Sequence, residues 1–544
     1  MTRVLVIGAG GVFGSRLAEG LLRRGFGVVV GGRSRARAEG VAARLKAAFP
    51  AAPVEVAVLD TATLTPEQLQ ATGAAVVADM AGPFQGAEPT SARAAIAAGL
   101  HYVDLADGRD FVAAFPALDE AARAAGVVAL TGCSSTPALS NAVLDRLTDG
   151  WREVVSVEAA ISPGARAPKG VSVMQAILSW MGRPVRVFEG GGWTMRRGWS
   201  GLYRRDLGEA GVRRVSLCET PDLDLFPARF APRDGALFLA GMEPWPLHLE
   251  AWVLGGLVRL FRFDPVPLAK PLLALAGLHA FIGSDRGAMR VQALGVDGQG
   301  RAVRAVWRLV AEPGEGPVTP SLPALAAIRA IAAGRVASGA RACVGVLPLE
   351  AIVDEMAPHG LTTGAETQRG LYSRAIGPAF DDLPAPIRAL HETPGRSVWR
   401  GRAMTEGASG PMAALAARII GFPKAQADCE AEVSIDADGE RSIWRRRIGG
   451  HGFASTLSRP REGGRVSERF GPLSMDLTLT PGNGRLVYRV DGWRAGPVPL
   501  PRWLCPATVA FEEVDAEGRF VFDVTITAPL LGRLVRYRGW LRQA

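Results

Sequence analysis

The chain has 544 residues, which is too long for one ordinary domain and indicates roughly two to four of them. Hydrophobic residues make up 48% of the sequence and charged residues 21%, a balance that supplies apolar cores and excludes global disorder. The net charge of +9 comes almost entirely from arginine. No compact basic run interleaved with aromatic residues occurs, so we expect no nucleic-acid partner.

The five cysteines are far apart and include no CxxC pair. They therefore predict neither a disulfide framework nor a zinc site, and we expect no metal. The first residues enter a strand pattern directly, which predicts no signal peptide. We expect a cytoplasmic protein, with a membrane-peripheral position left open by the apolar residues 246–283.

The chain begins with a strand, a glycine turn and a helix. Residues 3–7 form an apolar run after Arg3 that is rich in β-branched residues, and residues 15–22 have helical spacing. Glycines let the backbone approach a pyrophosphate, and the N–H groups at the helix start attract its charge. The spacing departs from a strict GxGxxG, and a turn without a ligand is the alternative. The expected dinucleotide cradle consists of Gly8, Gly10, Gly11, Val12, Phe13 and Gly14.

The end of the second strand, at residues 27–31, favours NADP over NAD. Cofactors with a free ribose 2′-hydroxyl usually meet an Asp or Glu here, and none is present. Arginine and serine suit a 2′-phosphate through charge-assisted hydrogen bonds. The alternative is a solvated helix start, because arginine is common throughout this chain. The expected phosphate ligands are Arg33, Ser34, Arg35 and Arg37.

Strand and helix patterns alternate up to residue 145, which predicts an α/β fold with a Rossmann-type doubly wound parallel sheet. Asp60 ends the third strand, where it could contact the adenine or form a turn. Cys133 follows a later strand on the ligand side of the sheet. Its segment could bind substrate, Cys133 could act as a nucleophile, or Thr136-Pro137 could simply start a helix, which we favour. The further strands are expected at 53–60, 74–84, 101–105 and 127–133, with a helix near 111–125.

In residues 146–322 the regular alternation of strand and helix patterns ends, and several amphipathic strand patterns follow with helical segments between them. This predicts an inserted α+β domain for substrate binding or dimerisation. A helix is expected at 169–182, and residues 323–360 return to helix and are assigned to the dinucleotide-binding domain of residues 1–145. The expected strands are 153–161, 193–199, 212–217, 287–294 and 302–310.

Two apolar segments, 247–261 and 266–282, are each too short to span a membrane. Three interpretations remain open. They could be helices buried in the domain or at a homodimer interface, a wall for a hydrophobic substrate, or an interfacial pair resting on a membrane.

Residues 361–383 are predicted to be a linker, and residues 384–544 an antiparallel β-rich accessory domain with helices at 384–392 and 410–420. Such a sheet with tryptophans more often encloses a core or a hydrophobic ligand than a catalyst. Candidates for the lining of a cup are His391, Trp399, Trp444, His451, Glu468 and Arg469. The expected strands are 427–435, 441–448, 453–459, 464–471, 474–480, 485–491, 507–515, 519–527 and 535–541.

Five spaced motifs make residues 1–360 resemble the saccharopine-dehydrogenase-like oxidoreductases. Residues 382–544 resemble an uncharacterised bacterial domain found fused behind such reductases, and that likeness implies no activity. The motifs are Gly8–Gly14, Gly31–Ser34, Ala81–Phe84, Ala98–Leu105 and the stretch Ala337–Cys343, which we expect to be helical.

The resemblance implies hydride transfer with NADP and places two segments at the reaction site. His101 and Tyr102 would be candidate proton donors and Asp104 an orienting carboxylate, although His101 and Tyr102 could instead pack structurally. The chain departs from the family at Leu105–Gly108, where relatives commonly continue into Gly-Glu. The segment expected to face the cofactor consists of Ala81, Gly82, Pro83 and Phe84.

We identify no set of basic groups that would grip a dicarboxylic amino acid, so we do not predict a role in lysine metabolism. The sequence predicts an NADP-dependent oxidoreductase acting on a small or partly hydrophobic, lipid-like substrate. The alternative is a non-catalytic or membrane-peripheral protein that binds a cofactor or a lipid.

Overall fold

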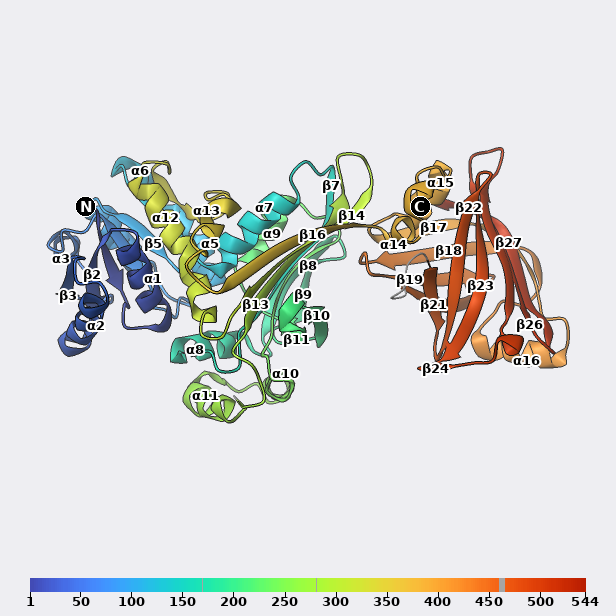
Figure 1. The fold of residues 1–544 in the computed structure, drawn as a ribbon, viewed down its shortest axis with the longest axis horizontal. Coiled ribbons are helices and arrows are strands. Elements are labelled where there is room, and N and C mark those ends of the chain that lie inside the picture. The colour runs from blue at the N-terminus through green and yellow to red at the C-terminus, as the bar shows by residue number, and fades with distance from the viewer. Residues whose placement is uncertain (169, 280, 459–464) are drawn as a thin grey trace. The chain divides into compact units, whose positions relative to one another are not determined.

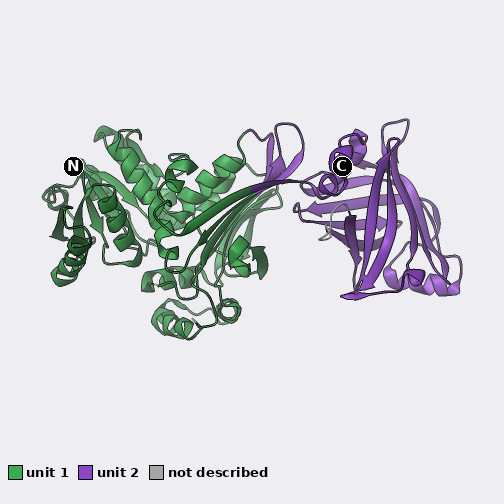
Figure 2. Cartoon of the chain, in the orientation of Figure 1, with its two compact units in different colours: residues 1–149, 157–293, 306–365 green, residues 150–156, 294–305, 366–544 purple. Residues whose placement is uncertain are grey.

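The computed structural model describes residues 1–168, 170–279, 281–458 and 465–544 (Figure 1). The chain divides into two compact units (Figure 2). The first comprises residues 1–149, 157–293 and 306–365. The second comprises residues 150–156, 294–305 and 366–544.

The first unit begins with a seven-stranded parallel sheet in the order β15-β6-β5-β4-β1-β2-β3. The strand order reverses between β1 and β4, which is where nucleotides bind in doubly wound sheets. The prediction of a Rossmann-type sheet is therefore confirmed. Its strands are β1 (Arg3–Ile7), β2 (Gly27–Gly32), β3 (Val54–Val58), β4 (Val76–Asp79), β5 (His101–Asp104), β6 (Val128–Thr131) and β15 (Gly339–Ala342).

Helices cover this sheet because its strands are apolar on both faces. The expected helix near 111–125 is split in two, with a 3-10 turn at Phe115–Leu118 between the halves. The helices are α1 (Val12–Arg23), α2 (Arg35–Ala48), α3 (Pro66–Gln70), α4 (Thr90–Ala97), α5 (Arg109–Ala114), α6 (Asp119–Ala124), α7 (Ser140–Leu147) and α12 (Leu322–Ala332).

The prediction of a helix at 337–343 is wrong, because Gly339–Ala342 form strand β15. Gly339 lies opposite Val128 of β6, in a parallel pair. Its φ of +129° lies in a region that favours glycine, and the Asp119 carboxylate accepts the N–H of Ala340 at 2.8 Å. The extended conformation of Gly339–Ala342 is therefore set by pairing with the open edge of β6, and not by local helix propensity.

A nine-stranded sheet follows, with the main order β10-β11-β12-β7-β13-β14-β16 and with β8 and β9 attached through β12. All five expected strands of this region are present, and β8, β10 and β12 are additional. The strands are β7 (Glu153–Ser162), β8 (Pro184–Glu189), β9 (Gly192–Arg197), β10 (Tyr203–Asp206), β11 (Val212–Leu217), β12 (Gly235–Ala240), β13 (Gly287–Val296), β14 (Ala302–Ala311) and β16 (Leu361–Arg369).

The helices of this part include the two apolar segments that the sequence singled out. Residues 169 and 280, which end or interrupt predicted helices, lie outside the described residues. Among the described residues no helix combines the length and apolar character needed to cross a membrane. The helices are α8 (Val171–Trp180), α9 (Asp222–Phe230), α10 (Trp245–Phe261), α11 (Ala269–Leu278) and α13 (Leu349–Val353).

Residues 361–383, expected as a linker, are instead largely ordered as regular structure. They form β16, helix α14 (Leu371–Ile376) and a 3-10 turn at Gly377–Phe380. β16 contains only one large apolar residue, so no strand signal exists in the sequence. Its extended conformation is fixed by pairing at the edge of the nine-stranded sheet, because its own sequence has no strand pattern.

The second unit is an eleven-stranded antiparallel sheet that closes into a barrel, because β22 pairs with both β21 and β23. Every strand predicted here exists, although Arg459 and Gly464 lie outside the described residues, and β17 and β24 are additional. The strands are β17 (Gly395–Glu406), β18 (Gln426–Ala437), β19 (Arg441–Ile448), β20 (His451–Ser458), β21 (Arg465–Phe470), β22 (Leu473–Gly482), β23 (Arg485–Ala495), β24 (Val498–Pro499), β25 (Ala507–Val514), β26 (Phe520–Ala528) and β27 (Gly532–Gln543).

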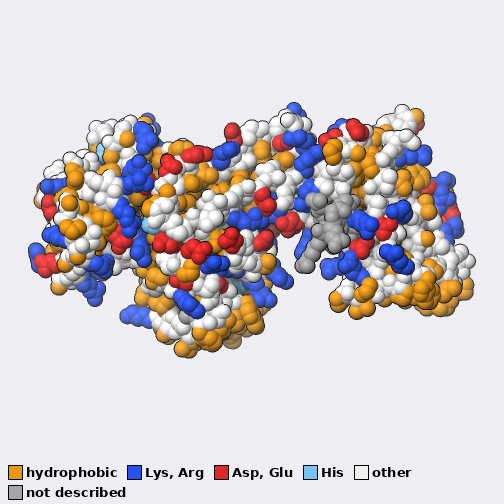
Figure 3. Space-filling model, in the orientation of Figure 1, with side chains coloured by type: hydrophobic (Ala, Val, Ile, Leu, Met, Phe, Trp, Pro, Cys, Tyr) orange, Lys and Arg blue, Asp and Glu red, His pale blue; other side chains and the backbone are white. Residues whose placement is uncertain are grey.

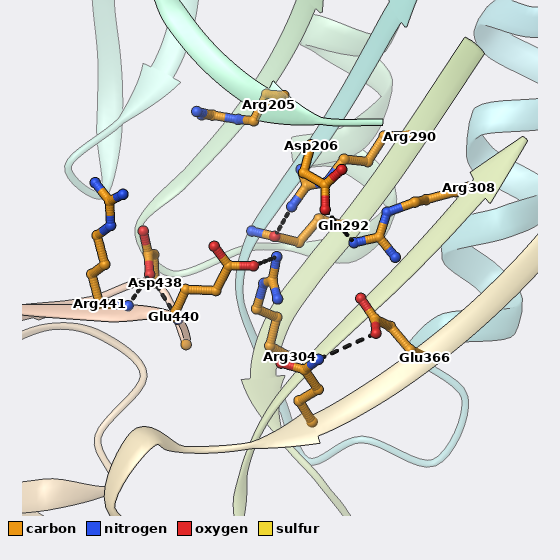
Figure 4. A network of polar contacts seen from close by, with 12 residues as sticks. Arg205, Asp206, Arg290, Gln292, Arg304, Arg308, Glu366, Asp438, Glu440 and Arg441 are labelled. Carbon is orange, nitrogen blue, oxygen red and sulfur yellow. Dashed lines mark hydrogen bonds and ion pairs between the residues drawn. The ribbon is translucent and has the colours of Figure 1, made fainter. Parts of the chain in front are cut away.

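Helices α14, α15 (Ala385–His391) and α16 (Pro411–Ile420) belong to the same unit. So does the segment 302–305, because the buried side chain of Arg304 forms an ion pair of 2.9 Å with Glu440 (Figure 4). The Asp438 carboxylate holds the turn that carries Glu440, since it accepts the N–H groups of Glu440 and Arg441 at 2.9 and 2.7 Å.

Candidate functional site

The glycine loop between β1 and α1 is folded tightly on itself. The N–H of Gly11 donates to the carbonyl of Gly8 at 2.9 Å. A Cβ at Gly14 would collide with that same carbonyl oxygen, and Gly8 has a φ of +78°. These two glycines are therefore required by the loop itself.

Gly10 differs from these two glycines, because the protein leaves room for a side chain there. An added Cβ would make only an ordinary contact of 3.5 Å with Val41. Gly10 and Gly11 are exposed, and no side chain caps the first turn of α1. Open backbone in front of a helix N-terminus fits a pyrophosphate, which needs close backbone approach and N–H donors.

The side chains after β2 differ in whether they already form a hydrogen bond or an ion pair within the protein. Ser34 caps α2 by accepting the N–H of Arg37 at 3.4 Å, and Arg35 forms an exposed ion pair of 3.7 Å with Glu39. Arg33 is exposed and has no ion pair with any residue that the structure describes. Of the four predicted phosphate ligands, Arg33 and Arg37 therefore have side chains without an ion pair among the described residues, and Arg33 is the nearer of the two to the end of β2.

Asp60 is exposed after β3 and forms a turn. Its carboxylate accepts the N–H of Ala62 at 3.1 Å, and its carbonyl accepts the N–H of Thr63. The turn that we considered from the sequence is therefore present, and a contact with adenine stays a prediction.

The segment Ala81–Phe84 follows β4 and lies directly beside the glycine loop. A Cβ at Gly8 would be 3.1 Å from the carbonyl carbon of Met80. The hydroxyl of Ser172, in α8, donates to the carbonyl of Gly82 at 3.2 Å. Residues from the inserted domain thus reach the place where the nicotinamide was predicted.

The three residues of β5 that we predicted as catalytic do not lie together. In the parallel register His101 is opposite Val76 at the start of β4, whereas Asp104 is opposite Asp79 at its end. His101 therefore lies at the amino edge of the sheet, where its Nδ1 accepts the N–H of Val128 at 3.0 Å. The glycine loop is at the carboxyl edge, with Asp104.

Tyr102 is buried, and its ring stacks on Phe115 at a centroid distance of 6.0 Å. Burial, with the neighbouring carboxylates of Asp104 and Asp79, raises the pKa of Tyr102 well above its usual value. A phenol in this position stays protonated and packs in the core.

Asp104 is fully buried at the carboxyl edge of the sheet. Its Oδ1 accepts hydrogen bonds from the N–H groups of Ala106 and Gly132, at 2.9 and 2.7 Å, and from the Thr131 hydroxyl at 2.9 Å. Its Oδ2 has no hydrogen-bond partner among the described residues. Burial outweighs these hydrogen bonds and raises the pKa of Asp104 to about 7.

Sequence reasoning missed a polar junction between β5 and the inserted domain. Arg109, at the start of α5, is only 6% exposed. Its Nε donates to Asp224 at 2.6 Å and its Nη1 to Glu219 at 3.2 Å. Burial raises the pKa of Glu219 to about 7. The signal was present as a charged pair, Asp107 and Arg109, directly after a strand end on the ligand side.

Asp107 joins two loops of the carboxyl edge. Its Oδ1 accepts a hydrogen bond from the Gln85 side chain at 2.9 Å. Burial raises the pKa of Asp107. The acidic residue within the segment that departs from the family pattern thus binds Gln85, the residue directly after the segment expected to face the cofactor.

The segment after β6 has a structural role. Thr136 and Ser140 donate to the buried carboxylate of Asp222 in α9, and burial raises the pKa of Asp222 to about 7. Cys133 is fully buried beside Cys343, and burial raises the pKa of its thiol well above the usual value. A protonated, inaccessible thiol argues against the nucleophile that we considered.

In the second unit, two of the six cup candidates line a large cavity, namely Trp444 and Glu468. Trp399 lies in the core. His451 is next to the β19–β20 turn, where its Nδ1 lies 3.1 Å from the carbonyl of Gly449. His391 lies at a smaller neighbouring cavity, and Arg469 lines a polar one.

Two family models match the chain. Residues 4–130 match the saccharopine dehydrogenase NADP binding domain, and residues 383–541 match a domain of unknown function, DUF4166. No curated protein sequence matches.

Several solved structures match parts of the chain. Saccharopine dehydrogenase (L-Glu forming) from Saccharomyces cerevisiae is 12% identical over 68% of this chain and 100% of its own, with a TM-score of 0.48. GenD2 from gentamicin A biosynthesis, in complex with NAD, is 18% identical over 66% of this chain and 93% of its own, with a TM-score of 0.31. An alcohol dehydrogenase from Thermococcus sibiricus is 19% identical over 19% of this chain and 57% of its own, with a TM-score of 0.16.

The family model that matches residues 4–130 confirms the resemblance to the saccharopine-dehydrogenase-like oxidoreductases and the expectation of NADP as the cofactor. The second family model agrees with the likeness of the C-terminal part to an uncharacterised domain. Residues 4–130 of this chain are thus similar to the saccharopine dehydrogenase NADP binding domain, and residues 383–541 to the DUF4166 domain.

Proposed function

We propose that this chain is an oxidoreductase that uses NADP to transfer hydride to or from a small, partly apolar substrate. The observation that carries the proposal is the open glycine loop at the start of α1, at the point where the strand order reverses, with the uncommitted Arg33 at the end of β2.

Each part of the carboxyl edge has a role in this proposal. Bound NADP supplies or accepts hydride at its nicotinamide ring. The loop Gly8–Gly14 binds the pyrophosphate, Arg33 binds the 2′-phosphate, and Ala81–Phe84 borders the nicotinamide. The contact of Ser172 with Gly82 brings the inserted domain, and with it the substrate, to the same place.

Hydride transfer to a carbonyl or imine also requires a proton. We assign it to Asp104, because a carboxyl with a pKa of about 7 holds a proton part of the time at neutral pH. Its Oδ2, which has no hydrogen-bond partner among the described residues, is the atom that would hold it. His101 takes no part, since it lies at the opposite edge of the sheet.

The test is a fluorescence titration of the full chain with NADPH and NADH. Arg33→Ala is expected to weaken NADPH binding by about 10- to 100-fold, the value of a lost hydrogen bond to a charged group, and to leave NADH binding unchanged. Arg44→Ala removes an equally exposed arginine farther along α2 and should change neither affinity. Failure to bind either cofactor, or equal affinity for both, would contradict the proposal.

The apolar pair α10 and α11 favours one of the three interpretations left open. Their inner residues, such as Ala251 and Ala269, pack with Met174 and Leu178 of α8. Their outer residues stay uncovered, with Leu260 71% and Phe261 68% exposed. Figure 3 shows hydrophobic side chains gathered over α10 and α11 of this unit.

We propose that this outer face rests on an anionic membrane surface, because Arg259, Arg262 and Lys270 accompany the apolar side chains. Co-sedimentation with phosphatidylglycerol vesicles is expected, and weaker binding to phosphatidylcholine vesicles. Phe261→Glu should abolish it, whereas Val212→Glu, at another exposed apolar residue, should not. A homodimer that Phe261→Glu dissociates, with no vesicle binding, would overturn this in favour of a self-association face.

A further inference from the structure

The C-terminal barrel encloses a cavity of about 400 Å³. Side chains normally fill small barrels to the density of an organic crystal, and unfilled apolar space reduces stability. The volume falls within the range of roughly 300–1,000 Å³ that small-molecule sites occupy. The space is therefore large enough to be a binding chamber rather than a packing defect.

The chamber wall is mainly apolar. Inward-facing residues of successive strands supply aliphatic and aromatic side chains, as the alternation of an antiparallel barrel requires. Representative lining residues are Ile448, Leu457, Leu477, Phe520, Phe522 and Ile526.

Arg446 and Glu468 on this wall neutralise each other, and the third charged residue of the lining, Glu512, contacts His391. Arg446 donates to Ser455 at 2.8 Å and to Glu468 at 3.3 Å, and its guanidinium lies 4.9 Å from the Trp444 ring centroid. Ser455 also donates to Glu468 at 2.6 Å. A carboxylate or ammonium ligand would find no uncompensated partner in this pair and would lose its hydration. The wall therefore selects for an uncharged ligand.

Hydrogen-bonding groups are also present inside the chamber. Tyr488 donates to Glu512 at 2.8 Å, and Glu512 also contacts His391, on which the Tyr372 ring stacks. The hydroxyl of Tyr537, a buried residue of the lining, makes no hydrogen bond with another described residue. Burial raises the pKa of Tyr537 to about 12, so this hydroxyl stays available as a donor.

One end of the chamber reaches solvent beside α16. Ile419 lines the cavity and is nevertheless 77% exposed. Met412 and Leu415, seven and four residues before it, lie on the same helical face and are also exposed.

Other connections at the same ends of the strands carry further exposed apolar side chains. Trp503, between β24 and β25, is 69% exposed, and Leu530, between β26 and β27, is 89% exposed. Figure 3 shows hydrophobic side chains gathered at the lower edge of this unit, where Figure 1 places α16 and β24. An apolar rim provides an entry path that an apolar molecule can follow without crossing charged surface.

We propose that the DUF4166 barrel binds one uncharged, lipid-like molecule, with its apolar chain in the chamber and its hydroxyl or carbonyl end hydrogen-bonded to Tyr537. This binding is independent of the cofactor, so it can be tested without NADPH.

The experiment is a titration of the full chain with Nile red, an uncharged fluorescent probe, followed by displacement at pH 8. Hexadecan-1-ol is expected to displace the probe at about 10-fold lower concentration than hexadecanoate, as expected if burying the uncompensated carboxylate costs at least about 1.4 kcal/mol. Absence of displacement by hexadecan-1-ol, or preference for hexadecanoate, would overturn the proposal.

Two variants locate the site. Leu477→Trp places a larger side chain in the chamber and should abolish probe binding, whereas Val487→Trp, at an exposed residue of the adjacent strand, should not. Tyr537→Phe keeps the ring and should weaken hexadecan-1-ol roughly 2- to 10-fold, the value of one hydrogen bond, without changing Nile red binding. Near-ultraviolet circular dichroism confirms that each variant is folded. Unchanged binding by a folded Leu477→Trp would place the ligand elsewhere and contradict the inference.

Discussion

The glycine-loop edge of the first unit and the barrel chamber of the second are built on opposite principles. The edge is made mainly by backbone, from residues close together in sequence, and it leaves N–H groups and Arg33 exposed to a charged ligand. The chamber is made by side chains from many strands, and its charges are already paired. A backbone site can be read from a short motif, whereas a side-chain chamber exists only after the sheet closes.

The buried junction of the first unit should show the largest effect, because its charges cannot be rehydrated when one is removed. Arg109→Met leaves the buried Glu219 without a guanidinium and Asp224 with Arg186 alone, and is expected to lower the free energy of unfolding by about 3–5 kcal/mol. Arg183→Met, which breaks an exposed pair with Asp264, should cost less than about 1 kcal/mol. Urea unfolding measures both, and equal small costs would show that the junction is solvated.

Ionisation of Asp104 should contribute to the pH dependence of the free energy of unfolding. Because its pKa is raised from 3.8 to about 7 in the folded chain, the contribution of Asp104 to stability is fully present below pH 4 and is lost as the pH rises through 7. Asp104→Asn keeps an acceptor at Oδ1 and should remove up to about 4 kcal/mol of this decline. The measurement is the difference between variant and wild-type unfolding free energies at pH 4 and pH 7.5. An unchanged difference would place the Asp104 pKa near its usual value and remove our reason for giving it the proton.

The glycine loop should be intolerant at the positions that its own backbone requires. Gly14→Ala would push a Cβ into the carbonyl of Gly8, at a cost of about 1–3 kcal/mol, and NADPH binding is expected to fall below detection. Gly40→Ala, in α2 with open space around it, is the matched control. Nile red binding by the barrel should survive in both variants. Loss of both activities in Gly14→Ala would show that the two sites depend on each other.

The smallest effect is expected from a variant that leaves an unpaired charge in the chamber, as Arg33 is unpaired among the described residues at the glycine-loop edge. Glu468→Gln leaves the charge of Arg446 uncompensated, so hexadecanoate should bind about 10-fold more tightly, for a gain of about 1.4 kcal/mol. Displacement of Nile red by hexadecanoate and hexadecan-1-ol in wild type and variant measures the change. If the preference does not move toward hexadecanoate, charge pairing does not set the selectivity.

Most of the sheet strands and the position of the cofactor edge could be predicted because they depend on local patterns. β17 was missed because its inward positions include Ser397, Ala403 and Thr405, so the apolar alternation that predicts a strand is absent. β15 and β16 were missed for a related reason. Each adds to the edge of an existing sheet, and the partner strand rather than the segment's own composition fixes its conformation.

The candidate site was predicted in part. Gly8, Gly14 and Arg33 lie where the motif indicated, whereas His101 lies at the far edge because it begins β5 and Asp104 ends it. Asp107 and Arg109 were overlooked as a site because their partners, Gln85, Glu219 and Asp224, come from distant parts of the chain.

The sequence by itself determined the glycine turn, the alternation of strands and helices that makes a parallel sheet, and the antiparallel hairpins of the C-terminal part. These follow from backbone conformation and from hydrophobic periodicity, which act over a few residues. Only the tertiary structure decided which carboxylates are buried, which arginines are paired and where space is left open. Burial and charge pairing depend on contacts between segments far apart in the sequence, and those contacts set both the pKa of Asp104 and the balanced charges of the barrel chamber.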